Sequence, residues 1–302
     1  MIALLAPGQG SQAEGMLLPW LELPGAADQM TLWSKASGLD LVRLGTTAST
    51  EEITDTAVAQ PLIVAATLLA HQELTRRELL TGEDLIVAGH SVGEIAAYAI
   101  AGVMGGDDAV ALAATRGAEM ARACAAEPTG MSAVLGGDEA EVLARLEQLD
   151  LFPANRNAAG QIVAAGALTA LEKLAEDPPA RARVRALGVA GAFHTRYMAS
   201  ALDGYAAAVA AIATAEPTAT LLSNHDGKPV RTAAAAMETL VAQLTQPVRW
   251  DLCTQTLREH DVQAIVEFPP AGTLAGIAKR ELRGVTARAV KSPADLDALA
   301  KL

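Results

Sequence analysis

Short apolar runs alternate with longer helical patterns along most of the chain. Residues 2–6 and 85–89 are apolar, which is typical of strands buried on both faces of a sheet. Helical propensity is found in residues 57–80, from residue 95 onward, and in residues 108–123. We expect Pro61 to lie in the first turn of the helix at 57–80. Residues 221–222 and 264–268 predict two more strands. Strands that alternate with long helices predict an α/β fold with a mostly parallel sheet.

The middle of the chain has a different pattern. We expect short strands at residues 130–136, 161–165 and 183–190, with helices at 139–148 and 169–176. A compact βαβ-like module therefore fits between residues 128 and 190, inserted into the larger core. After it, residues 194–215 predict a helix that ends at Pro217.

Composition narrows the classes of function. The 302 residues carry a net charge of −12 and 3% aromatic side chains, which argues against nucleic acid and anionic membranes as partners. Cys124 and Cys253 lie far apart without metal-type spacing, so we expect no disulfide framework, no metal site and a reducing compartment. No segment resembles a targeting signal or a membrane span, which favours a cytoplasmic protein.

The segment Gly89-His90-Ser91-Val92-Gly93 has the G-x-S-x-G pattern of a nucleophile turn. It follows a predicted strand and precedes a predicted helix, the context in which such a serine is exposed on a sharp turn. The Val92 amide, at the helix N-terminus, can point at an anion that develops beside Ser91.

A serine hydroxyl is a weak nucleophile and needs a base. His90 adjoins Ser91, but adjacent side chains point apart at a turn. Three other histidines remain comparable candidates from spacing alone: His194, His225 and His260. The chain order of an ordinary α/β-hydrolase would favour His260, with Asp226 or Asp251 as the acid.

Arg116 is the next informative residue. It shares one helical stripe with Leu112 and Met120. A guanidinium on an apolar stripe needs a carboxylate or phosphate partner. The alternative is a weak pair with Glu119 on the same helix.

Further motifs are spread over nearly the whole chain. They are Pro7-Gly8-Gln9-Gly10-Ser11-Gln12, Gln60-Pro61, Glu94 directly after the serine turn, Arg116-Gly117 with Met120, Asn155-x-Asn157 with Gly160-Gln161, Phe193-His194 with Met198, and Gln243-Leu244 through Pro247-Val248-Arg249-Trp250. Together they resemble the malonyl-CoA:acyl carrier protein transacylases and the related polyketide acyltransferase domains, above all their actinobacterial branch.

The resemblance implies a fold and a set of site residues. It implies an α/β-hydrolase-like core, residues 1–127 and 191–302, with a ferredoxin-like α+β insert at 128–190. It selects His194 as the base, oriented by the backbone carbonyl of Gln243, and Arg116 as the group that binds the malonyl carboxylate. Gln9 and Val92 would supply the oxyanion amides. Four more residues are carried over as substrate contacts: His90, Asn157, Phe193 and Met120.

The resemblance also implies an activity. A malonyl group would pass from malonyl-CoA to Ser91, and then to the phosphopantetheine thiol of acyl carrier protein, feeding fatty-acid synthesis. No cofactor is expected, because malonyl-CoA is a substrate, and we expect a monomer. Phe193 before His194 resembles the form associated with malonyl selection. An acidic carrier calls for a local basic patch, and the candidates are Arg181, Arg183, Arg185, Lys279 and Arg280.

Three other functions stay open. A serine hydrolase or thioesterase would depend on His260 rather than His194. A non-catalytic carrier-binding module would form no acyl-serine. A transacylase for methylmalonyl or acetyl groups would use the same serine.

Overall fold

The computed structural model describes residues 1–302. A six-stranded sheet forms its centre, in the order β10-β9-β1-β2-β7-β8. Neighbouring strands are parallel, except that β8 is antiparallel to β7. The strands are β1 (Ile2–Ala6), β2 (Leu85–Gly89), β7 (Thr220–Leu222), β8 (Pro229–Val230), β9 (Ala264–Glu267) and β10 (Thr286–Ala289). The apolar runs at 2–6 and 85–89 are thus confirmed as buried strands, paired with each other.

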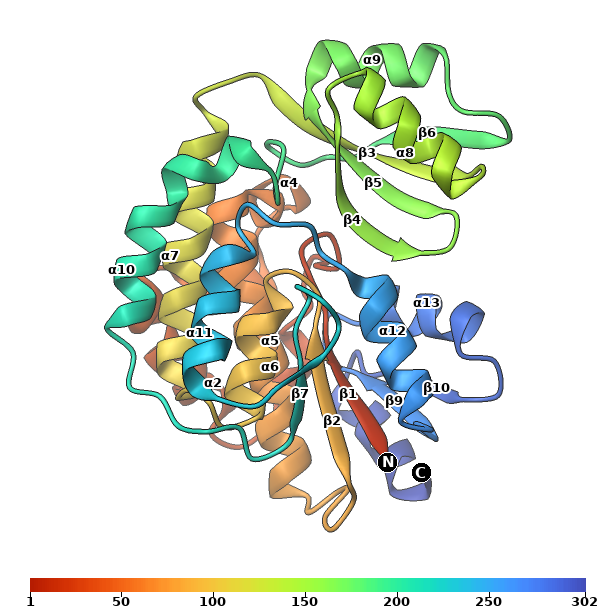
Figure 1. Cartoon of the computed structure of the whole chain (residues 1–302). Coiled ribbons are helices and arrows are strands. Elements are labelled where there is room, and N and C mark those ends of the chain that lie inside the picture. The colour runs from red at the N-terminus through yellow and green to blue at the C-terminus, as the bar shows by residue number, and fades with distance from the viewer.

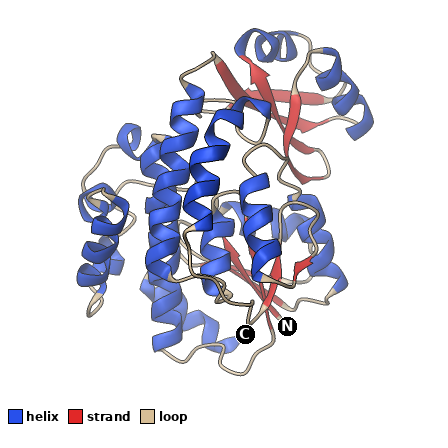
Figure 2. Cartoon of the chain, turned by 60° about the vertical axis from the view of Figure 1, so that its left-hand side comes forward, coloured by secondary structure: helices blue, strands red, loops and turns tan.

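Helices cover both faces of this sheet (Figures 1 and 2). Alternate strand side chains point to opposite faces, so Leu4 joins the larger apolar cluster while Ala3 and Leu5 join the smaller one. The larger cluster contains residues of α2 (Ala26–Ser37), α5 (Thr56–Arg76), α6 (Gly93–Ile100), α7 (Gly106–Cys124), α10 (Leu202–Ala210) and α11 (Ala233–Ala242). The smaller cluster contains residues of α12 (Trp250–Glu259) and α13 (Thr273–Glu281).

Short helices complete this part of the molecule. They are α1 (Leu18–Leu21), α3 (Leu41–Thr46), α4 (Thr50–Thr54), α14 (Pro293–Leu296) and the 3₁₀ helices η1 (Arg196–Ala201) and η2 (Asp297–Lys301). None of the helices combines the length and apolar character that a membrane span requires.

A second sheet stands beyond the carboxyl ends of β1 and β2, at the top of Figure 1. It is antiparallel, in the order β4-β5-β3-β6. Its strands are β3 (Thr129–Gly136), β4 (Phe152–Ala158), β5 (Gln161–Ala167) and β6 (Ala182–Ala186), and its helices are α8 (Glu139–Gln148) and α9 (Leu168–Glu176). Val134, Leu146 and Leu171 belong to a separate apolar cluster between this sheet and its two helices. The middle of the chain therefore has its own small core.

Three sequence predictions need correction. Helix α5 ends at Arg76 rather than 80, because Glu78 and Leu80 have positive φ angles that a right-handed helix does not allow. Pro61 is the sixth residue of α5, not part of its first turn. Strand β4 was not predicted: its sequence carries Pro153 and two asparagines, which disfavour strands, and an edge position tolerates them.

The predicted helix at 194–215 was also wrong in its bounds. His194 has a φ of 61°, a 3₁₀ helix follows at Arg196–Ala201, and α10 ends at Ala210. At the end of the predicted span, the amide of Ala215 donates to the carbonyl of Val103 instead of continuing the helix. Tertiary hydrogen bonds therefore outweigh the helical propensity of this alanine-rich segment.

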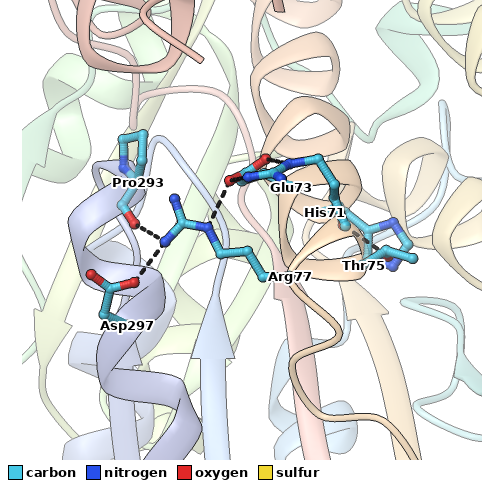
Figure 3. A network of polar contacts seen from close by, with 7 residues as sticks. His71, Glu73, Thr75, Arg77, Pro293 and Asp297 are labelled. Carbon is cyan, nitrogen blue, oxygen red and sulfur yellow. Dashed lines mark hydrogen bonds and ion pairs between the residues drawn. The ribbon is translucent and has the colours of Figure 1, made fainter. Parts of the chain in front are cut away.

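A polar network far from the serine turn ties α5 to the C-terminal segment (Figure 3). Arg77 donates to the Glu73 carboxylate at 2.6 Å, to the Pro293 carbonyl at 3.0 Å and to Asp297 at 2.7 Å. Because Glu73 is buried, these bonds stabilise a carboxylate that would otherwise be costly inside the protein.

Candidate active site

Ser91 lies on a strained turn between β2 and α6. Its φ is 53°, an uncommon value for a residue with a side chain. The turn is possible because its glycines allow close backbone contacts: a Cβ on Gly89 would lie 2.0 Å from the Gly93 oxygen, and one on Gly93 would lie 2.3 Å from the Ala6 oxygen. The G-x-S-x-G pattern thus has a steric cause.

His194 contacts the Ser91 hydroxyl directly. The Ser91 Oγ lies 2.8 Å from His194 Nε2, and His194 Nδ1 lies 2.8 Å from the Gln243 carbonyl oxygen. A carbonyl can only accept, so Nδ1 carries the proton and Nε2 is free to accept one from Ser91. Burial, aided by the charge of Arg116, lowers the pKa of His194 to about 3. The imidazole is therefore a neutral base at physiological pH.

Neither of the other candidate bases is hydrogen-bonded to Ser91. His225 is exposed, and its backbone amide donates to Ser223 Oγ at 3.2 Å. His260 lines a groove with Met1 and Glu83, at the opposite end of the strands from Ser91. The carboxylate of Asp251 is paired with Arg249 at 2.8 Å, and Asp226 accepts from the amide of Lys228. The serine, acid and histidine that the chain order of an ordinary α/β-hydrolase predicts therefore do not form this site.

Arg116 approaches the same hydroxyl from α7. Its Nη2 lies 3.4 Å from Ser91 Oγ and 2.7 Å from Gln243 Oε1, while Nη1 donates to Gln60 Oε1 at 2.7 Å. The side chain is buried, and burial lowers its pKa below the usual value. Glu119 pairs with Arg122 instead, so the predicted alternative of an Arg116–Glu119 pair was wrong. The guanidinium is held by neutral amide groups, which leaves its charge unpaired.

Two backbone amides near Ser91 donate no hydrogen bond within the chain. They belong to Val92 and to Gln9, in the loop after β1. Since β1 and β2 are adjacent and parallel, both loops lie at the carboxyl edge of the sheet, where open α/β sheets bind ligands. The arrangement can stabilise an anion beside Ser91.

A cavity of about 240 Å³ opens over Ser91 and His194, between the two sheets. His90, Asn157 and Phe193 all line it, and His90 Nε2 lies 2.8 Å from Asn157 Oδ1. Two expected substrate contacts, Met120 and Arg116, are not among the residues that line this cavity. Met120 is buried and accepts from Gln60 Nε2 at 3.4 Å. Arg116 is also buried, but it contacts the cavity residue Ser91. No group of His, Cys, Asp and Glu side chains is placed to hold a metal ion.

Sequence reasoning missed three residues that support the site. Gln60 belongs to a sequence motif that indicates no role for it, although its side chain accepts from Arg116. Glu94 and Asn224 were not proposed for the site, although both are buried beneath Ser91. Asn224 follows β7 at the carboxyl edge of the sheet, a position that could have identified it. Burial raises the pKa of Glu94 to about 8, against hydrogen bonds from Asn224 and Gln243 that lower it.

A serine on a strand–turn–helix, paired with a neutral imidazole and flanked by two free amides, is typical of enzymes that carry an acyl group on serine. Comparison with known proteins agrees. A family model described as "Acyl transferase domain" matches residues 4–295. The chain belongs to this family.

Its relatives are similar over the full length. The curated "Malonyl CoA-acyl carrier protein transacylase" of Mycobacterium tuberculosis is 85% identical over 302 residues, which is 100% of each chain. The crystal structure of MCAT from Mycobacterium tuberculosis superposes with a TM-score of 0.98 at 86% identity, over 99% of each chain. A malonyl-transacylase solved in complex with its type II PKS acyl-carrier protein superposes with a TM-score of 0.93 at 29% identity, again over 99% of each chain.

Proposed function

We propose that this chain is an acyltransferase that moves a malonyl group from malonyl-CoA to the phosphopantetheine thiol of acyl carrier protein, for fatty-acid synthesis. One observation carries the proposal: the Ser91 hydroxyl lies between a neutral His194 at 2.8 Å and a charged Arg116 at 3.4 Å. The names of the full-length relatives support the same activity.

The first half-reaction loads the serine. His194 Nε2 takes the proton of Ser91 Oγ, and the oxygen attacks the thioester carbonyl of malonyl-CoA. The amides of Gln9 and Val92 stabilise the tetrahedral anion, and such a donor contributes about 3–4 kcal/mol. The carbon–sulfur bond then breaks, and the coenzyme A thiolate takes the proton from His194.

The second half-reaction unloads it. The carrier thiol gives its proton to His194 and attacks the malonyl-serine ester. The carbon–oxygen bond breaks, and Ser91 recovers its proton from the imidazole. Throughout, the Gln243 carbonyl stabilises the protonated imidazole and keeps Nε2 directed at Ser91. This is ping-pong transfer without a third acidic residue.

Arg116 supplies the preference for a dicarboxylic acyl group. The two carboxyl carbons of a malonyl unit are joined through one methylene, so they are about 2.5 Å apart. A guanidinium within 3.4 Å of the nucleophile can therefore bind the free carboxylate while Ser91 attacks the other end. Arginine suits this role because its planar fork binds a carboxylate through two hydrogen bonds.

Phe193 is proposed to limit the acyl group to malonyl. Its ring lines the cavity beside His194, where it would crowd an α-methyl branch. His90 and Asn157, which also line the cavity and are hydrogen-bonded to each other, are proposed as contacts for the rest of the substrate. We propose Met120 as an indirect contributor, since it contacts Gln60 rather than the cavity.

The finer description of the fold is also a proposal. We assign residues 1–127 and 191–302 to an α/β-hydrolase-like core and 128–190 to a ferredoxin-like insert. The nucleophile turn after a central parallel strand supports the first assignment. The β-α-β-β-α-β succession from β3 to β6, with its antiparallel sheet, supports the second.

We propose that the carrier docks beside the exposed edge strand β6. Arg183 and Arg185 are exposed there, and Arg185 pairs with Ala133, which lines the cavity. Paired residues share a face of the sheet, so the arginines lie on the face that covers Ser91. Reversing the charge at Arg181, Arg183 and Arg185 should raise the KM for the carrier, and an unchanged KM would contradict this.

We further propose a monomer in the cytoplasm. Few large apolar side chains are exposed, namely Leu18, Leu32, Leu168 and Leu302, which suits a monomeric surface. Cys124 and Cys253 are both free thiols, as expected in a reducing compartment.

The activity is tested by comparing two histidine variants in a malonyl-transfer assay with holo acyl carrier protein. His194→Ala should abolish transfer, because it removes the proton acceptor at Ser91. His260→Ala should leave the rate unchanged. Ester cleavage without a carrier that depends on His260 would instead identify a hydrolase.

A further inference from the structure

A buried asparagine spans the strained serine turn. Asn224 accepts from the Ser91 amide through Oδ1 at 2.8 Å and donates from Nδ2 to the Gly89 carbonyl at 2.7 Å. One side chain thus binds a peptide group on each side of His90, at the point where the chain takes the positive φ of Ser91.

Asn224 is itself held on every side. It is fully buried, its backbone amide donates to the Glu94 carboxyl group, and its backbone carbonyl accepts from the Arg249 amide at 2.8 Å. All four of its hydrogen-bonding groups are therefore used. A side chain with so little freedom can impose a conformation on its neighbour rather than adapt to it.

The same cluster includes the support of the catalytic imidazole. Gln243 Nε2 donates to the Glu94 carboxyl group and lies 3.2 Å from the Ser91 carbonyl oxygen, while its backbone carbonyl accepts from His194 Nδ1 at 2.8 Å. Glu94 therefore connects Asn224, which holds the serine, to Gln243, which holds the histidine.

We infer that Asn224 is a positioning residue, which locks the Ser91 turn so that Oγ points at His194 and the Val92 amide points at the developing anion. Asparagine suits this position because a short side chain must both donate and accept. A carboxylate would repel the Gly89 carbonyl, and an apolar side chain would leave both peptide groups unpaired. The inference rests on the proposed role of Ser91 as nucleophile.

The test measures Ser91 acylation by malonyl-CoA in the full chain, by quenched flow and intact mass. Asn224→Ala should slow acylation at saturating malonyl-CoA by about 100-fold, the cost of a small misplacement of reacting groups. The KM should change by less than about threefold, because Arg116 is untouched. Loss of a residue with only a structural role would lower the amount of folded enzyme, but it would not slow acylation while leaving the KM nearly unchanged.

Thr67→Val is the matched control. Thr67 is buried and donates to the Pro269 carbonyl at 2.9 Å, so the variant also loses a buried hydrogen bond, but none to the serine turn. It should lower the Tm while keeping the acylation rate within about threefold of wild type. An equal rate loss in Thr67→Val and Asn224→Ala would overturn the inference.

Asn224→Asp covers the case in which the alanine variant does not fold. It keeps the acceptor for Ser91 and loses the donor to Gly89. Its acylation rate, relative to wild type at the same pH so that the titration of Glu94 cancels, should be low at pH 8 and rise towards pH 6 as the introduced carboxyl group gains a proton and can donate. A rate equal to wild type at pH 8 would overturn the inference.

A second probe separates this inference from the proposed function. Fluorophosphonates react with activated serines regardless of the preferred acyl group. Labelling of Ser91 should also be about 100-fold slower in Asn224→Ala. If wild type reacts with the fluorophosphonate but not with malonyl-CoA, the proposed substrate is wrong, and the labelling ratio alone decides the role of Asn224. An unchanged labelling rate would contradict that role.

Discussion

Replacing Arg116 with methionine removes the guanidinium that approaches the Ser91 hydroxyl while nearly keeping the side-chain volume. The effect on activity should depend on the acyl group. Malonyl transfer should fall steeply, because the substrate carboxylate loses its partner. Acetyl transfer should fall much less, because an acetyl group has no carboxylate to bind.

The magnitude follows from the surroundings of Arg116. A hydrogen bond to a charged group contributes about 1.5–3 kcal/mol, so a two-bond fork contributes about 3–6 kcal/mol. Coulomb attraction between unit charges 4 Å apart gives about 4 kcal/mol at an effective dielectric constant of about 20. Since Gln60 and Gln243 already occupy part of the fork, we take about 4 kcal/mol, or about a 1,000-fold loss in kcat/KM.

The assay compares kcat/KM for malonyl-CoA and acetyl-CoA, in wild type, Arg116→Met and Arg116→Ala. The malonyl value should fall about 1,000-fold and the acetyl value no more than about tenfold, the latter because Gln243 loses one partner. Tm values identify any general loss of folding. Equal losses for both substrates would refute carboxylate binding by Arg116.

Three further changes test other parts of the structure. Burial lowers the pKa of His71 from 6.5 to about 4, so the stability that the neutral imidazole contributes is complete above pH 6.5 and is lost as the pH falls towards 4. Between pH 7 and pH 5, the free energy of unfolding in urea should therefore fall by about 2 kcal/mol less in His71→Leu than in wild type. Phe193→Ser should raise the methylmalonyl-to-malonyl ratio of kcat/KM by about tenfold or more, the effect of a methyl group in a pocket, and an unchanged ratio would remove Phe193 from selection. Gly93→Ala should fail to fold or lose activity, because its Cβ would lie 2.3 Å from the Ala6 oxygen, whereas Gly188→Ala, which meets nothing within 4 Å, should behave as wild type in Tm and rate.

The fold was predictable where local pattern and tertiary structure agree. The runs at Ile2–Ala6 and Leu85–Gly89 are strands because their side chains are apolar on both faces. Strand β4 was missed because its polar sequence acquires strand geometry from pairing with β5, which no local pattern encodes. The helix expected up to residue 215 ends early for the same reason, since the amide of Ala215 donates to the distant carbonyl of Val103.

The site was predictable where chemistry has a local signature. Ser91 lies in a strained turn that requires its glycines. Arg116 is a charged side chain on an apolar helical stripe, which indicates that it binds a partner of opposite charge. The choice of His194 over His260 came from family resemblance, since spacing did not distinguish them. Glu94 and Asn224 have no local signature of their roles: a glutamate in the first turn of a helix is common, and an asparagine after a strand suggests a turn.

Intact mass spectrometry of the full chain after mixing with malonyl-CoA tests the central claim, that Ser91 carries the malonyl group. Wild type should gain the mass of one malonyl group and lose it when holo acyl carrier protein is added, while Ser91→Ala should gain nothing. The absence of a covalent adduct in wild type, or the same adduct in Ser91→Ala, would contradict the account.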